Sequence, residues 1–402
     1  MKTNDNAPLC INRRTVLATA GLSLLCGGAA GAGIVYATSG KGDGTASGDA
    51  PEQGGGQGGP GQGGGADTMS FDYTGTYSGA IEADGKEVSS ESESYAATES
   101  DQNAALAQNG GTLTLTTVTL TKKGDDTNGD NCNFYGVNSI LTAVGSESSA
   151  QLDACTLSAT SEGSNGIFAT DSATVLVNDT TIETSAGNSR GLDATYAGTI
   201  VAANMQIETQ GDHCAGIATD RGGGNISAAD CTISTAGSGS PVLYSTGDIE
   251  VCGITGTASG SQLAGMEGLN TILIKESELT SSITSKTASD PVANGVIIYQ
   301  STSGDAESTT GETATFQAVD STLSSSIQGG SMFYLTNTSA QVLLQNVELN
   351  FDSDANALLT AQGNDANSWG TAGSNGATVS FVAVGQTFAG TITADTLSLI
   401  HI

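Results

Sequence analysis

The chain has 402 residues, 56 of them glycine, and its 42 acidic and 11 basic side chains give a formal net charge of −31. This acidity excludes a nucleic-acid partner, because phosphate recognition needs clustered lysine and arginine. Aromatic residues make up 4% and charged residues 13% of the chain, which excludes a large aromatic-cored globule and a charge-rich disordered chain.

Residues 1–37 have the pattern of an export signal. Arg13 and Arg14 precede an apolar run rich in Ala, Gly and Leu, and Val35 and Ala37 supply small or β-branched residues at positions −3 and −1 of a cut after Ala37. The paired arginines resemble a twin-arginine signal, which exports folded proteins, although the general secretory route and an uncleaved anchor stay open. We therefore expect an exported protein, extracellular or at the cell surface. No later segment is apolar for long enough to span a membrane, so the mature chain has no span unless the signal is retained.

Three further segments flank the centre of the chain. Residues 38–66 are almost entirely Gly, Gln, Ser, Asp and Pro, and such a sequence predicts a disordered linker. Residues 67–108 are expected to form an N-terminal cap over the open backbone ladder of the first repeat. Residues 397–402 resemble the translation of a transposon end used in sequencing, so we interpret them as an artefact on a truncated chain; a short genuine strand is the alternative.

Residues 109–396 repeat with a period of about 25. An apolar residue opens a short alternating run at Leu152, Val175, Ile200, Ile226, Ile249 and Ile272. A second apolar column contains Leu157, Ile182, Ile207 and Ile233. A third column places a glycine before an apolar residue at Gly166, Gly191 and Gly216. Units this short cannot bury a core alone, so they are expected to stack on one another.

Each unit has strand chemistry. The runs are β-branched and partly alternating, and Gly, Asn, Asp and Ser separate them. Two or three short strands and tight polar corners per unit predict one coil of a solenoid, whose strands pair in parallel with those of the next coil. We therefore predict an all-β fold, a single-stranded parallel β-helix of about ten coils. The over-long units at residues 122–135, 285–313 and 352–376 are expected to be loops.

With this repeat, the chain resembles right-handed parallel β-helix proteins of the pectate-lyase-like type, particularly secreted or surface-displayed bacterial members. The resemblance covers roughly residues 103–396 and rests on repeat length and pattern, without a catalytic motif. It implies a right-handed coil, as parallel crossovers generally prefer. The function we expect first is a non-catalytic, adhesin-like scaffold that binds an extracellular glycan or a host surface. A polysaccharide lyase or glycoside hydrolase and a purely structural stalk are the alternatives.

The enzymatic alternative has few candidate residues. Lyases that this resemblance implies need a base, commonly Arg or Lys, beside carboxylates that hold calcium. The residues that would have to converge are Arg190, Asp193, Asp220 and Arg221. The same arginines could instead neutralise nearby carboxylates on an acidic surface. Ligand binding without catalysis has three weak candidates, of which Tyr196 would be a stacking plate for sugar: Tyr196, His213 and Trp369.

Calcium is the one cofactor that the sequence suggests. An oxygen-rich segment around a glycine contains Asp125, Asp126, Asn128 and Asp130. It lacks the distal glutamate of a helix-loop-helix site, and an ordinary acidic turn is the alternative. The cysteines show no zinc-binding spacing. Cys155 and Cys231 are predicted to be buried small hydrophobes, and a disulfide from Cys214 to Cys231 or Cys252 stays open.

Overall fold

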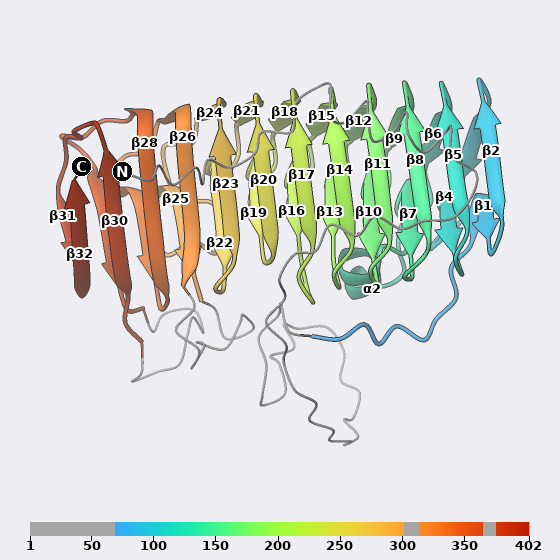
Figure 1. Ribbon diagram of the computed structural model, residues 1–402, viewed down its shortest axis with the longest axis horizontal. Coiled ribbons are helices and arrows are strands. Elements are labelled where there is room, and N and C mark those ends of the chain that lie inside the picture. Colours follow the sequence, from blue (N-terminus) through green and yellow to red (C-terminus); the bar gives the residue numbers. More distant parts are fainter. Residues whose placement is uncertain (1–68, 301–312, 365–374, 402) are drawn as a thin grey trace, which may run out of the picture. The chain divides into compact units, whose positions relative to one another are not determined.

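The chain is a parallel β-helix in a computed structural model that describes residues 69–300, 313–364 and 375–401 (Figure 1). This confirms the predicted fold class. The expected export signal, the glycine-rich linker and Trp369 lie outside the described residues. Each coil contributes one strand to a first sheet and then one or two strands to a second sheet, as β10, β11 and β12 do before β13 starts the next coil.

The first sheet, which we call face A, has 12 strands, one per coil. Its strands are β1 (Gly79–Asp84), β4 (Asn103–Gln108), β7 (Leu141–Val144), β10 (Ile167–Thr170), β13 (Leu192–Ala194), β16 (Ile217–Thr219), β19 (Leu243–Ser245), β22 (Ala264–Glu267), β25 (Asn294–Tyr299), β27 (Ser331–Thr336), β29 (Ala357–Gln362) and β31 (Ile392–Ala394). The described residues therefore form 12 coils of the β-helix, where we predicted about ten.

The second sheet has 20 strands, which we divide into faces B and C by their place in the coil. Face B holds β2 (Glu87–Glu91), β5 (Thr112–Thr116), β8 (Ser149–Asp153), β11 (Thr174–Asn178), β14 (Thr199–Ala203), β17 (Asn225–Ala229), β20 (Asp248–Cys252), β23 (Thr271–Lys275), β26 (Ala314–Ser325), β28 (Ser339–Asn350), β30 (Thr378–Val384) and β32 (Thr396–His401). Face C holds β3 (Ser94–Ala97), β6 (Thr119–Lys122), β9 (Thr156–Ala159), β12 (Thr181–Thr184), β15 (Gln206–Thr209), β18 (Thr232–Thr235), β21 (Thr255–Ala258) and β24 (Glu278–Ser281), and β26 and β28 continue into it.

The repeat columns predicted from the sequence are ladders between coils. Val175 pairs with Ile200, and the second column pairs in the same register from Leu157 to Ile233. One assignment was wrong, because Leu152 pairs with Val177 and Ala150 takes the place opposite Val175. A shift of two residues keeps a side chain on the same face of a strand, so alternation alone cannot detect it.

The glycine column marks a close approach between coils. A Cβ atom on Gly191 would lie 2.4 Å from the carbonyl oxygen of Gly216 and 2.4 Å from Cγ2 of Ile207.

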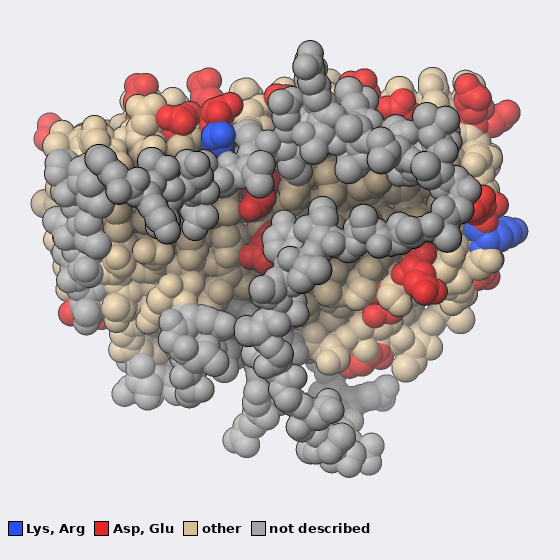
Figure 2. Space-filling model, in the orientation of Figure 1, with Lys and Arg blue, Asp and Glu red and all other residues tan. Residues whose placement is uncertain are grey.

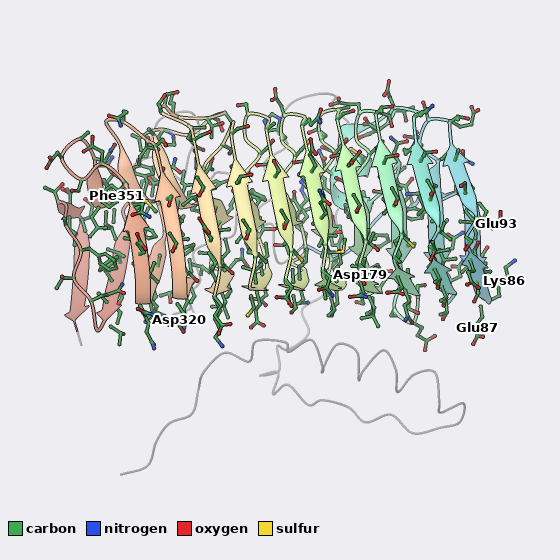
Figure 3. All side chains as sticks on the ribbon, turned by 90° about the horizontal axis from the view of Figure 1, so that it is seen from above. Lys86, Glu87, Glu93, Asp179, Asp320 and Phe351 are labelled. Carbon is green, nitrogen blue, oxygen red and sulfur yellow. The ribbon has the colours of Figure 1, made fainter. Side chains whose placement is uncertain are left out.

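Faces B and C meet at a different kind of corner, where one residue of most coils has a positive φ. Asp179 and Asp320 are examples, along one edge in Figure 3. Asp and Asn tolerate this left-handed conformation better than most residues, which explains the polar corners of the repeat.

The N-terminal boundary of the β-helix differs from the prediction. Residues 79–108, which we expected to belong to a cap, already form strands of the first two coils: β1 pairs with β4, and β2 with β5. Alternation in this segment is short and carries several glutamates, so the sequence repeat did not reveal it. At the other end β32 pairs with β30. The interpretation of residues 397–402 as an artefact stays a prediction.

The three segments predicted as loops contain regular structure. Residues 122–135 include the helix α2 (Gly129–Tyr135), and Asn128 caps it by accepting hydrogen bonds from the backbone N–H groups of Asp130 and Asn131. The other two segments contain face A strands, β25 and β29, which pair with β27. The prediction was wrong for these strands because insertions of irregular length beside them break the 25-residue spacing.

Candidate functional site

Face A differs from the other faces on its outer side. Strands of faces B and C alternate between buried residues and partly or fully exposed ones, as in β11 and β12. Strands of face A are buried on both sides, as in β10 and β13. The outward column of face A, paired from coil to coil, contains Phe168, Asp193, Ala218, Tyr244, Gly265, Ile297 and Tyr334. A carboxylate within such a column needs a specific partner.

Arg190 is that partner. Its guanidinium lies 3.2 Å from Asp193 and 3.1 Å from Asp220, and it donates a hydrogen bond of 3.0 Å to Oδ1 of Asn133 in α2. All three charged residues are less than 10% exposed. Three of the four residues of the enzymatic alternative therefore meet, because the corners before β13 and after β16 bring them to one place. The fourth, Arg221, stacks instead on the ring of Phe134, with Cζ 3.6 Å from its centroid.

The protonation of this cluster follows from its burial. Burial raises the pKa of Asp193 well above its usual value, and Asp220 adds to the effect while Arg190 opposes it. Burial likewise raises the pKa of Asp220 against the influence of Arg190. Burial lowers the pKa of Arg190, but Asp193 and Asp220 outweigh it and raise that pKa overall. Arg190 stays charged and cannot accept a proton, so it does not serve as the base that a lyase needs.

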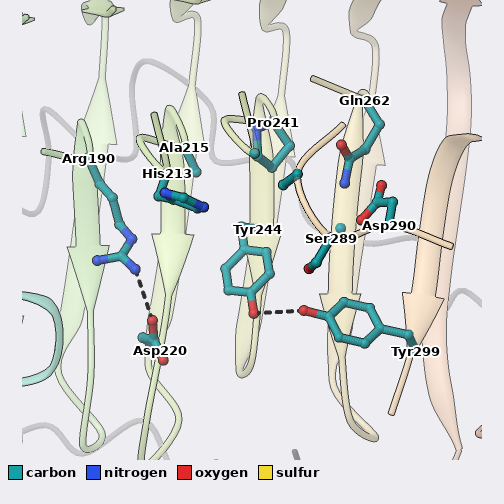
Figure 4. A pocket seen from close by; sticks show the side chains of 13 residues that line it. Arg190, His213, Ala215, Asp220, Pro241, Tyr244, Gln262, Ser289, Asp290 and Tyr299 are labelled. Atoms are coloured by element: carbon teal, nitrogen blue, oxygen red, sulfur yellow. Dashed lines mark hydrogen bonds and ion pairs between the residues drawn. The ribbon is translucent and has the colours of Figure 1, made fainter. Parts of the chain in front are cut away.

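A pocket of about 200 Å³ opens beside this cluster on the outer side of face A (Figure 4). The polar residues that line it are Arg190, His213, Asp220, Tyr244, Gln262, Ser289, Asp290 and Tyr299. They come from five successive coils, from the corner before β13 to the end of β25. The lining thus combines hydroxyl, amide, imidazole and carboxyl groups with two aromatic rings.

Two tyrosines form one wall of the pocket. The hydroxyl groups of Tyr244 and Tyr299 lie 3.1 Å apart, and both donate to Oε2 of Glu267, at 3.1 Å and 3.3 Å. Burial raises the pKa of both hydroxyl groups well above its usual value, and the nearby Glu267 raises it further. Both tyrosines therefore stay protonated at any physiological pH.

Asp290 lies across the pocket from the buried cluster, on the segment that precedes β25 (Figure 4). Its Oδ2 accepts a hydrogen bond of 2.8 Å from Asn294. Burial raises the pKa of Asp290 to about 6, while the Asn294 hydrogen bond and Lys286 oppose the shift. This carboxyl group therefore changes charge just below neutral pH.

The predicted ligand-binding residues have different positions. His213 is exposed at the pocket, as a binding residue would be. Tyr196 is only 4% exposed, because Tyr135 stacks on its ring at 5.4 Å and Phe71 meets its edge at 5.5 Å. The prediction of an open stacking plate at Tyr196 was wrong. Residues 69–78, the blue segment that leads to β1 in Figure 1, cover this corner of the coil stack.

The candidate calcium segment makes protein contacts of its own. Oδ1 of Asp125 accepts a 3.0 Å hydrogen bond from the backbone N–H of Glu162, and Asn128 is occupied as the cap of α2. Burial raises the pKa of Asp126, and the nearby Glu162 adds to this shift. Within residues 69–300, 313–364 and 375–401, no three His, Cys, Asp or Glu side chains are grouped so that they could hold a metal ion.

The cysteines agree with one prediction and not with the other. Cys155 and Cys231 are buried in the column that they share with Met205, as predicted. Cys214 is a buried free thiol, so the disulfide considered for it does not form. Its sulfur instead accepts a hydrogen bond from the backbone N–H of Ser189, 3.0 Å away.

Sequence reasoning missed most of the pocket. Tyr244, Gln262, Glu267 and Asp290 were not among the candidates, because they do not repeat at 25 residues and Asp290 lies in the irregular insertion before β25. One signal was available: Tyr244 interrupts the apolar-polar alternation at a place where Asp193 and Phe168 do so in earlier coils.

No protein-family model and no curated protein matches the sequence. Among solved structures, the crystal structure of a TibC-catalyzed, hyper-glycosylated TibA55-350 fragment matches with 12% identity and a TM-score of 0.18, over 72% of this chain and 99% of that fragment. In the described part of the chain, no helix is long and apolar enough to cross a membrane. Acidic side chains outnumber basic ones on the surface that Figure 2 displays.

Proposed function

We propose that this protein is an exported, cell-surface β-helix that binds a saccharide, without catalysis, in the pocket on face A. The observation that carries the proposal is the pocket lining itself. Two tyrosine rings stand beside amide, hydroxyl and carboxyl groups, from Gln262 to Asp290. Sugars need this combination, because their hydroxyl groups require donors and acceptors while their C–H faces pack on aromatic rings.

The size of the pocket limits the ligand. At about 200 Å³ it is smaller than the sites of roughly 300–1,000 Å³ that take drug-sized ligands. A single sugar residue, or the end of a chain, suits this volume better than a long segment of polysaccharide. The strands and corners that line the pocket are fixed by parallel ladders on both sides, so little ordering is needed on binding.

The state of the charged residues favours binding over catalysis. Arg190 is held by two carboxyl groups, and Arg221 packs on Phe134. Neither arginine is placed to remove a proton from a substrate, which a lyase would require. This leaves the scaffold function that the repeat itself suggested, with the pocket as its binding site.

A glycan array tests this proposal directly. Labelled protein should be retained by a restricted set of glycans, and Tyr244→Ala should abolish retention because the variant removes one wall of the pocket. Glu183→Gln is the matched control, since Glu183 is exposed on face C, far from the pocket in the coil. Absence of retention on every glycan of a broad array, or retention unchanged in Tyr244→Ala, would refute the proposal.

A further inference from the structure

We infer that the face A pocket selects a saccharide that bears a free amine over the same saccharide in acylated form, and rejects saccharides that bear a carboxylate. This inference rests on the proposed function and names the class of sugar that the site takes. It follows from the distribution of charge around the pocket and from which of those charges are already paired.

Carboxyl groups approach the pocket from three coils. Asp220 and Asp290 line it, and Glu267 lies directly behind the two tyrosine hydroxyl groups. The three residues follow β16, precede β25 and end β22, so a ligand meets acidic groups on several sides. Asp220 is ion-paired with Arg190, so the attraction for a positively charged group on the ligand comes mainly from Asp290.

The guanidinium of Arg190 is already ion-paired, and Lys286 lies outside the pocket. Arg190 lines the pocket beside His213, and the two ion pairs of Arg190, at 3.2 Å and 3.1 Å, occupy its guanidinium. Lys286 acts on the charge of Asp290 but is exposed and does not line the pocket. A ligand carboxylate would therefore face Asp290 while the guanidinium of Arg190 is already paired, and like charges in a partly buried site repel strongly.

The aromatic wall supports the same choice. The rings of Tyr244 and Tyr299 line the pocket together with the carboxyl groups. An ammonium group is attracted to the face of an aromatic ring as well as to a carboxylate. An acetylated amine loses both interactions, because the amide carries no charge. A carboxylate gains neither.

The buried carboxyl group at Asp290 makes the selection depend on pH. Asn294 donates to Oδ2 of Asp290 and Lys286 acts on its charge, while burial raises its pKa to about 6. The other charged or titratable groups of the same pocket are Arg190, His213, Asp220, Tyr244 and Tyr299. Asp290 is therefore mostly ionised at pH 7 and mostly neutral at pH 5. Acidification should remove the attraction for an amine without affecting the tyrosine wall.

Titration calorimetry of the full chain at pH 6.5 tests the inference with three probes. These are a glucosamine trimer, its fully N-acetylated form and a galacturonic acid trimer. The glucosamine trimer should bind about tenfold or more tightly than the acetylated trimer, because a hydrogen bond to a charged group exceeds a neutral one by roughly this factor. The galacturonic acid trimer should show no binding.

Two variants locate the effect. Asp290→Asn should reduce the preference for the amine to less than about threefold. Glu183→Gln removes the same charge from face C and should leave the preference unchanged. If Asp290→Asn does not fold, the native chain provides a second test. Raising sodium chloride from about 50 mM to about 500 mM should weaken binding of the glucosamine trimer and leave binding of the N-acetylated trimer unchanged.

Each contrary result has a distinct meaning. Equal affinity for the amine and its acetylated form, a preference that survives Asp290→Asn, or tightest binding of the galacturonic acid trimer would overturn the charge selection while leaving saccharide binding intact. Failure of every glycan on the broad array would instead overturn the proposed function.

Discussion

The outer sides of faces A and C show how one repeat can carry two kinds of surface. On face C the outward positions of each strand, such as Thr181 and Glu183 of β12, meet solvent. On face A the outward positions are buried and include Asp193 and Tyr244, beside a pocket. Each face has its own inward apolar column and its own parallel ladder between coils. The difference shows that the inward positions of the repeat encode the fold. The candidate site lies where the outward positions are buried instead of exposed.

The largest expected effect sharpens the contrast between buried and exposed ion pairs. Arg190→Ala leaves Asp193 and Asp220 buried without a counter-charge, so it should lower the free energy of unfolding by about 3–5 kcal/mol. Lys275→Ala breaks the more exposed pair with Glu276 on face B and should cost less than about 1 kcal/mol. Urea denaturation measures both.

A double variant completes that test. Asp193→Asn in the Arg190→Ala background removes one of the uncompensated charges and should recover part of the lost stability. Equal costs for the two single variants would mean that the face A cluster is no more buried than the surface pair, and the contrast between the faces would fail.

Substitutions at two neighbouring positions of one strand test whether inward positions of the repeat contribute more to stability than outward ones. Ile200→Ala empties a fully buried position in β14 and should cost about 2–4 kcal/mol, because it creates a cavity between coils. Val201→Ala, one residue later on the outer side of face B, should cost less than about 1 kcal/mol. Thermal or urea unfolding of the pair provides the measurement, and a reversed order would contradict the register of the ladder.

The buried carboxyl groups of face A predict how stability changes with pH. Burial raises the pKa of Asp290 from 3.8 to about 6, so the folded chain binds more protons than the unfolded chain between these values. Stability should therefore fall as pH rises from 4 to 7, by roughly 3 kcal/mol for this group. The raised pKa values of Asp193 and Asp220 act in the same direction.

Denaturation at pH 4.5 and pH 7 checks this sign. Asp290→Asn should flatten the dependence, while Glu183→Gln on face C should not. A native chain that becomes more stable between pH 4.5 and pH 7 would contradict the burial of these groups.

The smallest effect concerns a single hydroxyl group in the pocket. Tyr244→Phe removes the hydroxyl that donates to Glu267 and contacts the Tyr299 hydroxyl, and should weaken saccharide binding about five- to tenfold with little change in stability. Tyr95→Phe removes a comparable hydroxyl contact with Ser90 on the other sheet and should leave affinity unchanged. Calorimetry with the best ligand from the array measures the affinity of both variants. An equal loss of affinity in Tyr244→Phe and Tyr95→Phe would show that the Tyr244 hydroxyl does not contribute specifically to binding.

The sequence predicts the fold well because the inward positions repeat. Ile182, Ile207 and Ile233 keep a fixed spacing, and that spacing is the register of the ladder. The first coils escaped prediction because their strands are short and rich in glutamate, as in β2. The register error at Leu152 arose because residues two apart share a face.

The candidate site was predictable only in part. Arg190, Asp193 and Asp220 stood out as rare charges near repeat corners, and they do meet. Asp290 lies in an insertion that breaks the spacing and Tyr299 follows it, so no column places them beside Tyr244. The burial of Tyr196 depends on Phe71, more than a hundred residues earlier, and no local pattern reports such a contact.

The central claim is that ligand recognition belongs to the outer side of face A. A crystal structure of the protein soaked with the glucosamine trimer tests it most directly. We expect the terminal sugar between the Tyr244–Tyr299 wall and Asp290, with its amine directed to the carboxyl group. A trimer bound along the outer side of face B or C, with the face A pocket empty, would contradict the claim.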